Sequence, residues 1–96
     1  MKAVTLVHHR VADFDAWKAV YDSFAPVQTG HGVRHHHVWR SPDDPSLVVV
    51  VHTFDSPEAA RAFLDLAERR EVMGKAGVDL SSVKIEVLDE VDGGAR

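Results

Sequence analysis

The 96-residue sequence contains no cysteine, which excludes disulfide scaffolds, thiolate zinc sites, iron–sulfur clusters and cysteine nucleophiles. The sequence also lacks a large excess of charge of either sign, because it has eleven Lys and Arg residues and fifteen Asp and Glu residues, for a net charge of −4. No basic run is present to neutralise phosphates, so we expect no binding to nucleic acid. No stretch approaches the roughly 20 apolar residues of a membrane span, and the first residues lack a signal-peptide layout. We therefore expect a cytoplasmic protein that does not insert into membranes.

Several catalytic motifs are missing as well. The sequence has no glycine-rich phosphate loop, no dinucleotide-binding fingerprint and no Gly-x-Ser-x-Gly nucleophile elbow. What is present is the composition of a folded domain, with 45% hydrophobic residues, six Gly and four Pro. These observations predict a single domain over residues 1–91, followed by a flexible C-terminal tail over residues 92–96.

The order of the predicted elements indicates the fold class. Strand-like segments rich in β-branched residues cover residues 2–10, 33–40, 46–54 and 83–91. One helix is expected from Asp13, as its N-cap, to Pro26, and a second from Ser56 to Gly77 with a break near Arg70. The resulting β-α-β-β-α-β order predicts a ferredoxin-like α+β fold with a four-stranded antiparallel sheet. Right-handed crossovers place the third strand between the first and the second, and the fourth strand beside the first.

Spacing along the second helix predicts which of its faces is buried. Its apolar residues recur at helical intervals and form the expected inward stripe of Ala60, Phe63, Leu64 and Ala67. Arg69 is expected on the solvent side, in an i,i+4 pair with Asp65.

The third strand is apolar on both of its faces. Residues 47–51 read Leu-Val-Val-Val-Val, whereas an antiparallel sheet with one wet face should alternate apolar and polar residues. Two helices cover only one face, so the opposite face would carry a large exposed apolar patch. The simplest cover is the sheet of a second copy, which predicts a homodimer. One unusually hydrophobic strand in a monomer is the alternative.

Seven histidines are the most unusual feature of the composition. If the hairpin between the second and third strands pairs Arg40 with Leu47, His35 lies opposite His52, and His37 shares their face. A register shifted by one residue would instead place Arg34 and His36 beside His52. The sequence alone leaves both registers open.

Three interpretations of the histidines compete. Imidazoles on adjacent strands resemble a transition-metal site, although no carboxylate falls near them in the strands and no helical His-x-x-x-His pair exists. Alternatively, one imidazole is a general base in an apolar pocket that deprotonates a phenolic or enolic substrate. In the third interpretation, several histidines are simply partly exposed strand residues that hydrogen-bond to water.

The general-base interpretation assigns a role to each candidate residue, and it requires neither a metal ligand nor a cofactor. The candidate catalytic residues are His37, His52 and His35. The candidate substrate-binding residues are Trp39, Tyr21, Trp17, Phe24, Arg34 and His9. In this set the aromatic rings would form the walls, and Arg34 or Arg40 would hold a substrate oxygen anion. The aromatic residues at helical spacing are also typical of an ordinary core.

Four segments resemble one known family. Val11–Lys18 (VADFDAWK) is similar to the start of the first helix in small dimeric α+β barrel proteins. Arg40–Pro45 (RSPDDP), before a Val-rich strand, resembles their hairpin. Phe54–Ala60 (FDSPEAA) and Met73–Val78 (MGKAGV) resemble the start and the end of their second helix. The likeness is to antibiotic-biosynthesis-monooxygenase-like and cyclase-like members, and it spans about residues 4–91.

This resemblance implies a dimer whose sheets stack into a barrel, with a ligand cleft between the helices and the sheet of each protomer. Some members oxidise aromatic polyketides without metal or flavin, whereas others degrade haem, isomerise lactones or only bind ligands. Haem-degrading members rely on an Asn beside a Trp and a His, and this sequence contains no Asn. Because fold membership does not settle function, these remain expectations.

The leading hypothesis is a homodimer that binds a small aromatic or polyketide-like molecule. It would act on that molecule as a cofactor-independent monooxygenase, isomerase or cyclase with a His general base. The alternatives are a non-catalytic ligand-binding or stress-related dimer and a His-cluster metal-binding protein. A pocket of at least about 300 Å³ with a His at its floor would favour the enzyme, and a collapsed core would favour the non-catalytic protein.

Overall fold

The computed structural model describes the whole chain, from Met1 to Arg96, as one sheet with helices on one of its faces. In chain order the elements are β1 (Ala3–Val11), α1 (Phe14–Ser23), α2 (Ala25–Gly30), β2 (His35–Arg40), β3 (Leu47–Phe54), α3 (Pro57–Leu64), α4 (Ala67–Lys75) and β4 (Val78–Asp89). The strand order is β2-β3-β1-β4, and each neighbouring pair is antiparallel. The predicted ferredoxin-like α+β fold, with its strand order, is therefore confirmed.

Each of the two predicted helices is divided into two. Asp13 caps α1, where its Oδ1 accepts a hydrogen bond from the backbone N–H of Ala16 at 3.1 Å. Pro26 lies in the first turn of α2, where its missing N–H costs nothing, so it begins a new helix after Phe24. The first helical segment therefore bends at Phe24 and continues to Gly30.

The second helical segment breaks earlier than predicted. Ser56 caps α3 by accepting the Ala59 N–H at 3.1 Å, and α3 ends at Leu64. Leu66 has extended backbone dihedrals, so α4 starts in a new direction after Asp65 rather than after Arg70. Gly77, at φ +74°, turns the chain into β4. Because the break changes the helical phase, Ala67 is exposed instead of buried.

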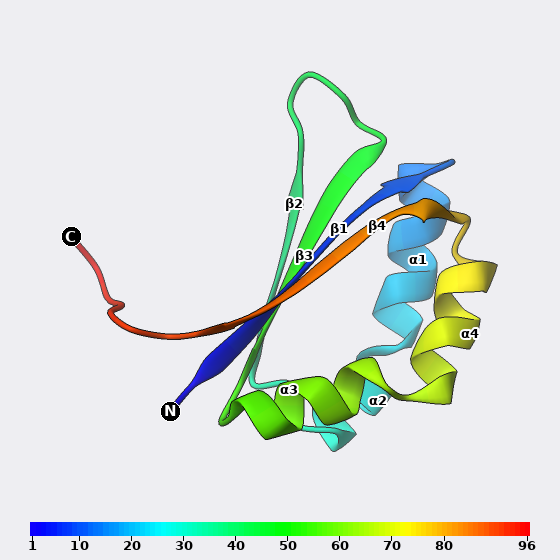
Figure 1. Cartoon of the computed structure of the whole chain (residues 1–96). Helices are drawn as coiled ribbons and strands as arrows, with labels where there is room; N and C mark the ends of the chain where they lie inside the picture. The colour runs from blue at the N-terminus through cyan, green and yellow to red at the C-terminus, as the bar shows by residue number, and fades with distance from the viewer.

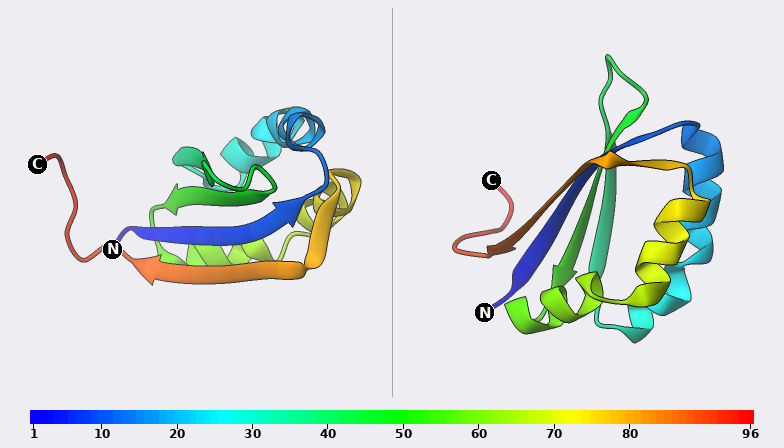
Figure 2. Two further views of the ribbon diagram at one scale, coloured as in Figure 1. Left: turned by 90° about the horizontal axis from the view of Figure 1, so that it is seen from above. Right: turned by 45° about the vertical axis from the view of Figure 1, so that its right-hand side comes forward.

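The helices all lie on one side of the sheet, and the other side has none (Figures 1 and 2). Phe54 and Val48 of β3 are the largest apolar side chains fully enclosed beneath this layer. One buried cluster consists of Val7, Val11, Trp17, Val48, Val50 and Ala76, and the other of Phe24, Phe54, Ala60 and Phe63. Alternation along β1 and β3 therefore points every second residue into this core.

The hairpin between β2 and β3 has the second of the two possible registers. Arg40 pairs with Val48, and His36 lies opposite His52. The alternative pairing of Arg40 with Leu47 does not occur, because the loop is closed by its own hydrogen bonds. The Ser41 N–H donates to the Leu47 carbonyl at 3.1 Å, so Leu47 lies opposite Ser41 and Arg40 lies opposite Val48.

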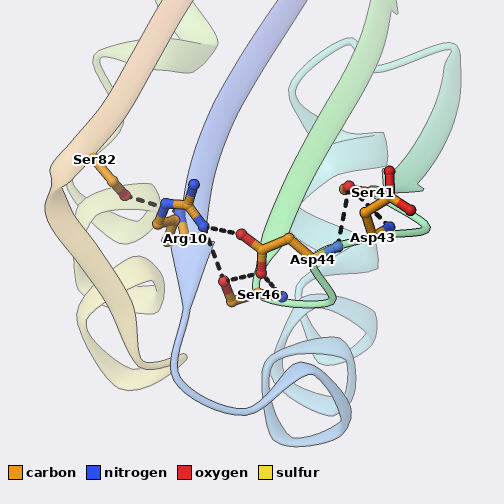
Figure 3. Close-up of polar contacts among 6 residues, drawn as sticks. All are labelled: Arg10, Ser41, Asp43, Asp44, Ser46 and Ser82. Atoms are coloured by element: carbon orange, nitrogen blue, oxygen red, sulfur yellow. Dashed lines mark hydrogen bonds and ion pairs between the residues drawn. The ribbon is translucent and has the colours of Figure 1, made fainter.

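Polar side chains fasten this loop to the rest of the sheet (Figure 3). The Ser41 hydroxyl accepts hydrogen bonds from the backbone N–H groups of Asp43 and Asp44. Asp44 forms an ion pair with Arg10 of β1, and Ser46 hydrogen-bonds to both of these side chains. The pKa of Asp44 falls to about 2 because Ser46 and Arg10 stabilise its carboxylate. The side chains of the loop thus stabilise the turn, as their sequence predicts.

The last strand begins five residues earlier than predicted, at Val78 rather than Val83, and ends at Asp89. A bulge in its pairing with β1, between His8 and Arg10, accommodates the additional residues. After Asp89 the chain forms neither helix nor strand (Figure 1). None of the helices is long and apolar enough to cross a membrane.

Replacing the cap residue Ser56 with Ala should lower the free energy of unfolding by about 1 kcal/mol, because the Ala59 N–H loses its acceptor. Chemical denaturation of the variant and the parent measures this difference. Ser23→Ala is the control: its exposed hydroxyl donates to a carbonyl of the same helix, and its loss should change stability by less than about 0.5 kcal/mol. Equal effects of the two substitutions would contradict the capping role.

Candidate functional site

A pocket lies between the helical layer and the sheet, and it encloses about 60 Å³, room for a few water molecules. Its floor comes from β1 and β3, and its walls come from the four helices. Eleven of the sixteen lining residues are hydrophobic. The lining side chains that carry hydrogen-bonding or charged groups are Thr5, His9, Trp17, Tyr21, Gln28, His52 and Arg69.

His52 and Tyr21 form a hydrogen-bonded pair in this pocket. The Tyr21 hydroxyl lies 2.8 Å from Nε2 of His52. His52 is only 5% exposed, and burial, together with the nearby His36 and Arg69, lowers its pKa to about 4. The imidazole is therefore neutral at pH 7, a state in which it can accept a proton.

Tyr21 stays protonated beside this imidazole. Burial raises the pKa of its phenol to about 12, and a hydrogen bond from Gln28 offsets part of that rise. Gln28 is itself buried and lines the same pocket. The neutral phenol therefore donates a hydrogen bond to the neutral imidazole, whose Nε2 accepts it.

His9 is a second neutral imidazole in the pocket. Its Nδ1 lies 3.0 Å from the backbone carbonyl oxygen of Val48, and a carbonyl only accepts hydrogen bonds, so Nδ1 carries the proton. Burial lowers the pKa of His9, which keeps the ring neutral. Nε2 of His9 is consequently unprotonated and available as an acceptor. The Trp17 ring packs against the His9 ring at 5.4 Å between centroids.

Aromatic rings enclose the two histidines. Trp17 stacks on Tyr21 at 5.1 Å between ring centroids, and Phe63 meets His52 edge-to-face at 5.6 Å. Phe24 also lines the pocket. The structure therefore brings together five of the candidate site residues: His52, His9, Tyr21, Trp17 and Phe24. Phe63 and Leu64, predicted only as part of the buried stripe of the second helix, line the pocket as well. Whether they bind a substrate remains a prediction.

The other candidates lie elsewhere. His35, His37 and Trp39 are exposed on the opposite face of the sheet, where the His37 and Trp39 rings stack at 6.0 Å. The expected cluster of His35, His37 and His52 does not form, because a shift of one residue in register sends alternate side chains to the other face. Arg34 is also outside the pocket and pairs with Asp55 at 2.7 Å.

His36 takes the position opposite His52 that the first register would give to His35. It lies on the helical face of the sheet, and its ring centroid is 6.2 Å from that of Tyr21. The structure contains no group of three or more His, Cys, Asp or Glu side chains arranged to hold a metal ion. The metal hypothesis thus loses the three-histidine set on which it depended.

Arg69 is the charged pocket residue that the sequence interpretation missed. It is only 8% exposed, whereas its i,i+4 spacing from Asp65 predicts a solvent-facing ion pair. Asp65 follows the end of α3 and Arg69 lies in α4, so the break between the two helices removes that pairing. The signal in the sequence is the spacing of Arg69 with Val72, Met73 and Ala76, which all line the pocket from one face of α4.

Comparison with known proteins identifies the family. The family model for antibiotic biosynthesis monooxygenases matches residues 3–75. The chain belongs to the antibiotic biosynthesis monooxygenase family. A comparison with curated protein sequences finds no match.

Solved structures show that other proteins share this fold at low sequence identity. SnoaB, a cofactor-independent oxygenase from Streptomyces nogalater, is 12% identical, with a TM-score of 0.79 over 96% of this chain and 95% of that one. Rv0793 from Mycobacterium tuberculosis is 16% identical, with a TM-score of 0.70 over 99% of this chain and 100% of that one. A conserved Methanosarcina mazei protein is 9% identical, with a TM-score of 0.73 over 91% and 90%. At such identities, the likeness shows the fold of this family member and not its chemistry.

Burial of the neutral His52 should make the protein less stable in acid. Its pKa is about 4 when folded and 6.5 when free, so the unfolded chain takes up this proton first as the pH falls. The free energy of unfolding should decrease from pH 6.5 to pH 4, by at most about 3 kcal/mol from this residue. Denaturant titrations across this range measure the slope.

The matched variants are His52→Gln, which should reduce that slope, and His31→Gln at the exposed end of α2, which should retain it. A slope that is the same in His52→Gln and in the parent would contradict the burial of a neutral imidazole.

Proposed function

We propose that the pocket binds a small aromatic or polyketide-like molecule and that the His52–Tyr21 pair removes a proton from it. The reaction would be cofactor-independent oxygenation, or a related isomerisation or cyclisation that begins with the same proton transfer. The observation that carries the proposal is a neutral imidazole hydrogen-bonded at 2.8 Å to a neutral phenol in a mostly apolar pocket. Such a pair is a base that needs no metal ion.

The proton would move in a relay, because the Tyr21 hydroxyl occupies Nε2 of His52. Tyr21 passes its proton to Nε2 while its oxygen takes a proton from an acidic CH₂ group of an aromatic ketone. The resulting carbanion, delocalised as an enolate, supplies the electrons that reduce dioxygen, and a carbon–oxygen bond forms. Return of the proton and loss of water convert CH₂ into C=O, so that CH₂ and O₂ give C=O and H₂O. The substrate is itself the reductant, and the proposal therefore requires no cofactor.

The volume of the cavity favours a second candidate function. At about 60 Å³ the cavity is well below the roughly 300 Å³ of a typical ligand pocket. Entry of an aromatic molecule would require α4 to move away from α1. The junctions between helices, at Phe24 and at Leu66, are the places where the helical layer can bend. A dimer that binds ligands without catalysis, or whose pocket stays filled by its own side chains, is the alternative.

We also propose that the uncovered face of the sheet binds a second copy of the chain. Apolar side chains on this outer face include Val4, Leu6, Trp39, Val49, Val51 and Leu88. Trp39 is 60% exposed and Leu88 is 44% exposed in the isolated protomer. A contiguous apolar patch on an antiparallel sheet is typical of an interface between subunits. Stacking two such sheets would form the dimeric barrel that the sequence predicts.

Substituting His52 with Gln should reduce oxygen consumption with an aromatic ketone that has an acidic CH₂ group. Loss of a general base reduces the rate by about 10² to 10⁴-fold. Tyr21→Phe should also reduce it, because the relay loses its hydroxyl. The measurement is the rate of oxygen uptake, with His31→Gln, at the exposed end of α2, as a control that should keep the parent rate. A His52→Gln variant as active as the parent would exclude the proposed base and favour the non-catalytic dimer.

Sedimentation of the purified protein at micromolar concentration should show a dimer. Val51→Asp places a carboxylate at the centre of the outer face and should give a folded monomer, because burying that charge between sheets is costly. Asp55→Asn, outside this strand, is a control that should remain dimeric. A monomeric parent protein would exclude the proposed dimer.

A further inference from the structure

Arg69 is a buried cation without a partner. Its side chain makes no ion pair and no hydrogen bond within the chain, although the residue is only 8% exposed. By contrast, Arg10 and Arg34 on the surface are each paired with an aspartate. A guanidinium group cannot lose its proton in a protein, so Arg69 carries a full positive charge into the pocket.

The surroundings of Arg69 supply no negative charge. None of the sixteen residues that line the pocket is Asp or Glu. Burial and then Arg70 lower the pKa of Arg69, and Arg69 in turn contributes to the lowered pKa of His9 and of His52. The two histidines are neutral imidazoles, and Arg70 is another cation. The pocket lining thus offers Arg69 no anionic partner, so an anion that entered the pocket would meet a cation that no side chain of the chain already pairs.

The position of Arg69 relates this charge to the proton-transfer pair. The guanidinium lies close enough to His52 and to His9 to lower the pKa of both. All three residues line the same pocket, with Arg69 on α4 and the histidines on the sheet. A ligand between these elements would have the base at one side and the cation at another. Arg is well suited to this role, because its planar fork donates two parallel hydrogen bonds to an oxygen anion.

We propose that Arg69 is the anion-binding residue of this pocket and that its ligands are apolar molecules carrying an ionised oxygen, namely a phenolate or an enolate. This inference rests on the proposed function in one respect, that the pocket admits a ligand. It adds to the proposed function the residue that would hold the ionised oxygen of a phenolic or enolic ligand. Arg69 would hold the oxygen on which negative charge resides, in the role that the sequence interpretation gave to Arg34 or Arg40.

The test uses 4-nitrophenol, whose absorption spectrum changes on ionisation, and its neutral methyl ether 4-nitroanisole. Binding to the protein is followed by fluorescence of Trp17, which lines the pocket, and by the nitrophenol spectrum. The parent protein should bind the phenolate at least about tenfold more tightly than the ether, since a charge-assisted hydrogen bond contributes that much. The bound phenol should ionise at a lower pH than the free phenol.

The variants are Arg69→Met, which keeps the length of the side chain, and Arg70→Met, the exposed neighbour on the same helix. In Arg69→Met the ratio of affinities for the phenolate and the ether should fall close to one, and the bound phenol should ionise at the same pH as the free phenol. Arg70→Met should retain both properties of the parent. Because Arg69→Met removes an unpaired buried charge, its Tm should equal or exceed that of the parent. Thermal unfolding therefore confirms that this variant is folded.

Each result separates this inference from the proposed function. If the parent binds both probes equally, or without a shift in the ionisation of nitrophenol, Arg69 is not an anion-binding residue. The same conclusion follows if Arg69→Met keeps the preference of the parent. If neither probe binds, both the inference and the proposed function are wrong. If the preference depends on Arg69 while oxygen uptake is unaffected in His52→Gln, the anion site stands and the proposed catalysis fails.

Discussion

Packing of the helical layer on one face of the sheet is the constraint on which the rest of this structure depends. It encloses Val48 and Phe54 completely and points alternate residues of β1 and β3 beneath the helices. His9 and His52 are carried into the same layer by that alternation, because they occupy inward positions of their strands. Their neutrality follows from burial, which opposes charge on an imidazole. The chemistry of the pocket is thus a consequence of the packing.

The polar groups of the pocket differ in how well they are satisfied. His52 has Tyr21 as a partner, and His9 has a backbone carbonyl, so both imidazoles are held in defined orientations. Arg69 alone has no partner of opposite charge. An unpaired charge that lines a pocket is a candidate for a functional role. The pocket combines a neutral base with an unpaired cation, and it differs in this respect from the fully apolar core that surrounds it.

Much of the fold could be predicted from local patterns. The caps at Asp13 and Ser56 and the order of strands and helices led to the correct sheet topology. Tyr21 and Trp17 were expected as pocket walls, and both line the pocket. The set of histidines was predicted less well, because it depended on hairpin pairing and on the exact length of the closed loop. The buried position of Arg69 depended on a helix break that no proline or glycine marks.

The sequence by itself determined the fold class, the one-sided helical layer and the apolar character of both faces of β3, because these follow from local propensity, capping and periodicity. Only the tertiary structure decided which charged and titratable side chains share a pocket. Side chains alternate with a period of two along a strand, so one residue of register exchanges His35 for His36 beside His52. Likewise, because the chain turns between α3 and α4, Arg69 lies in the interior and not on the solvent side that a continuous helix would give it. Both outcomes depend on contacts between segments far apart in the chain, which local pattern does not encode.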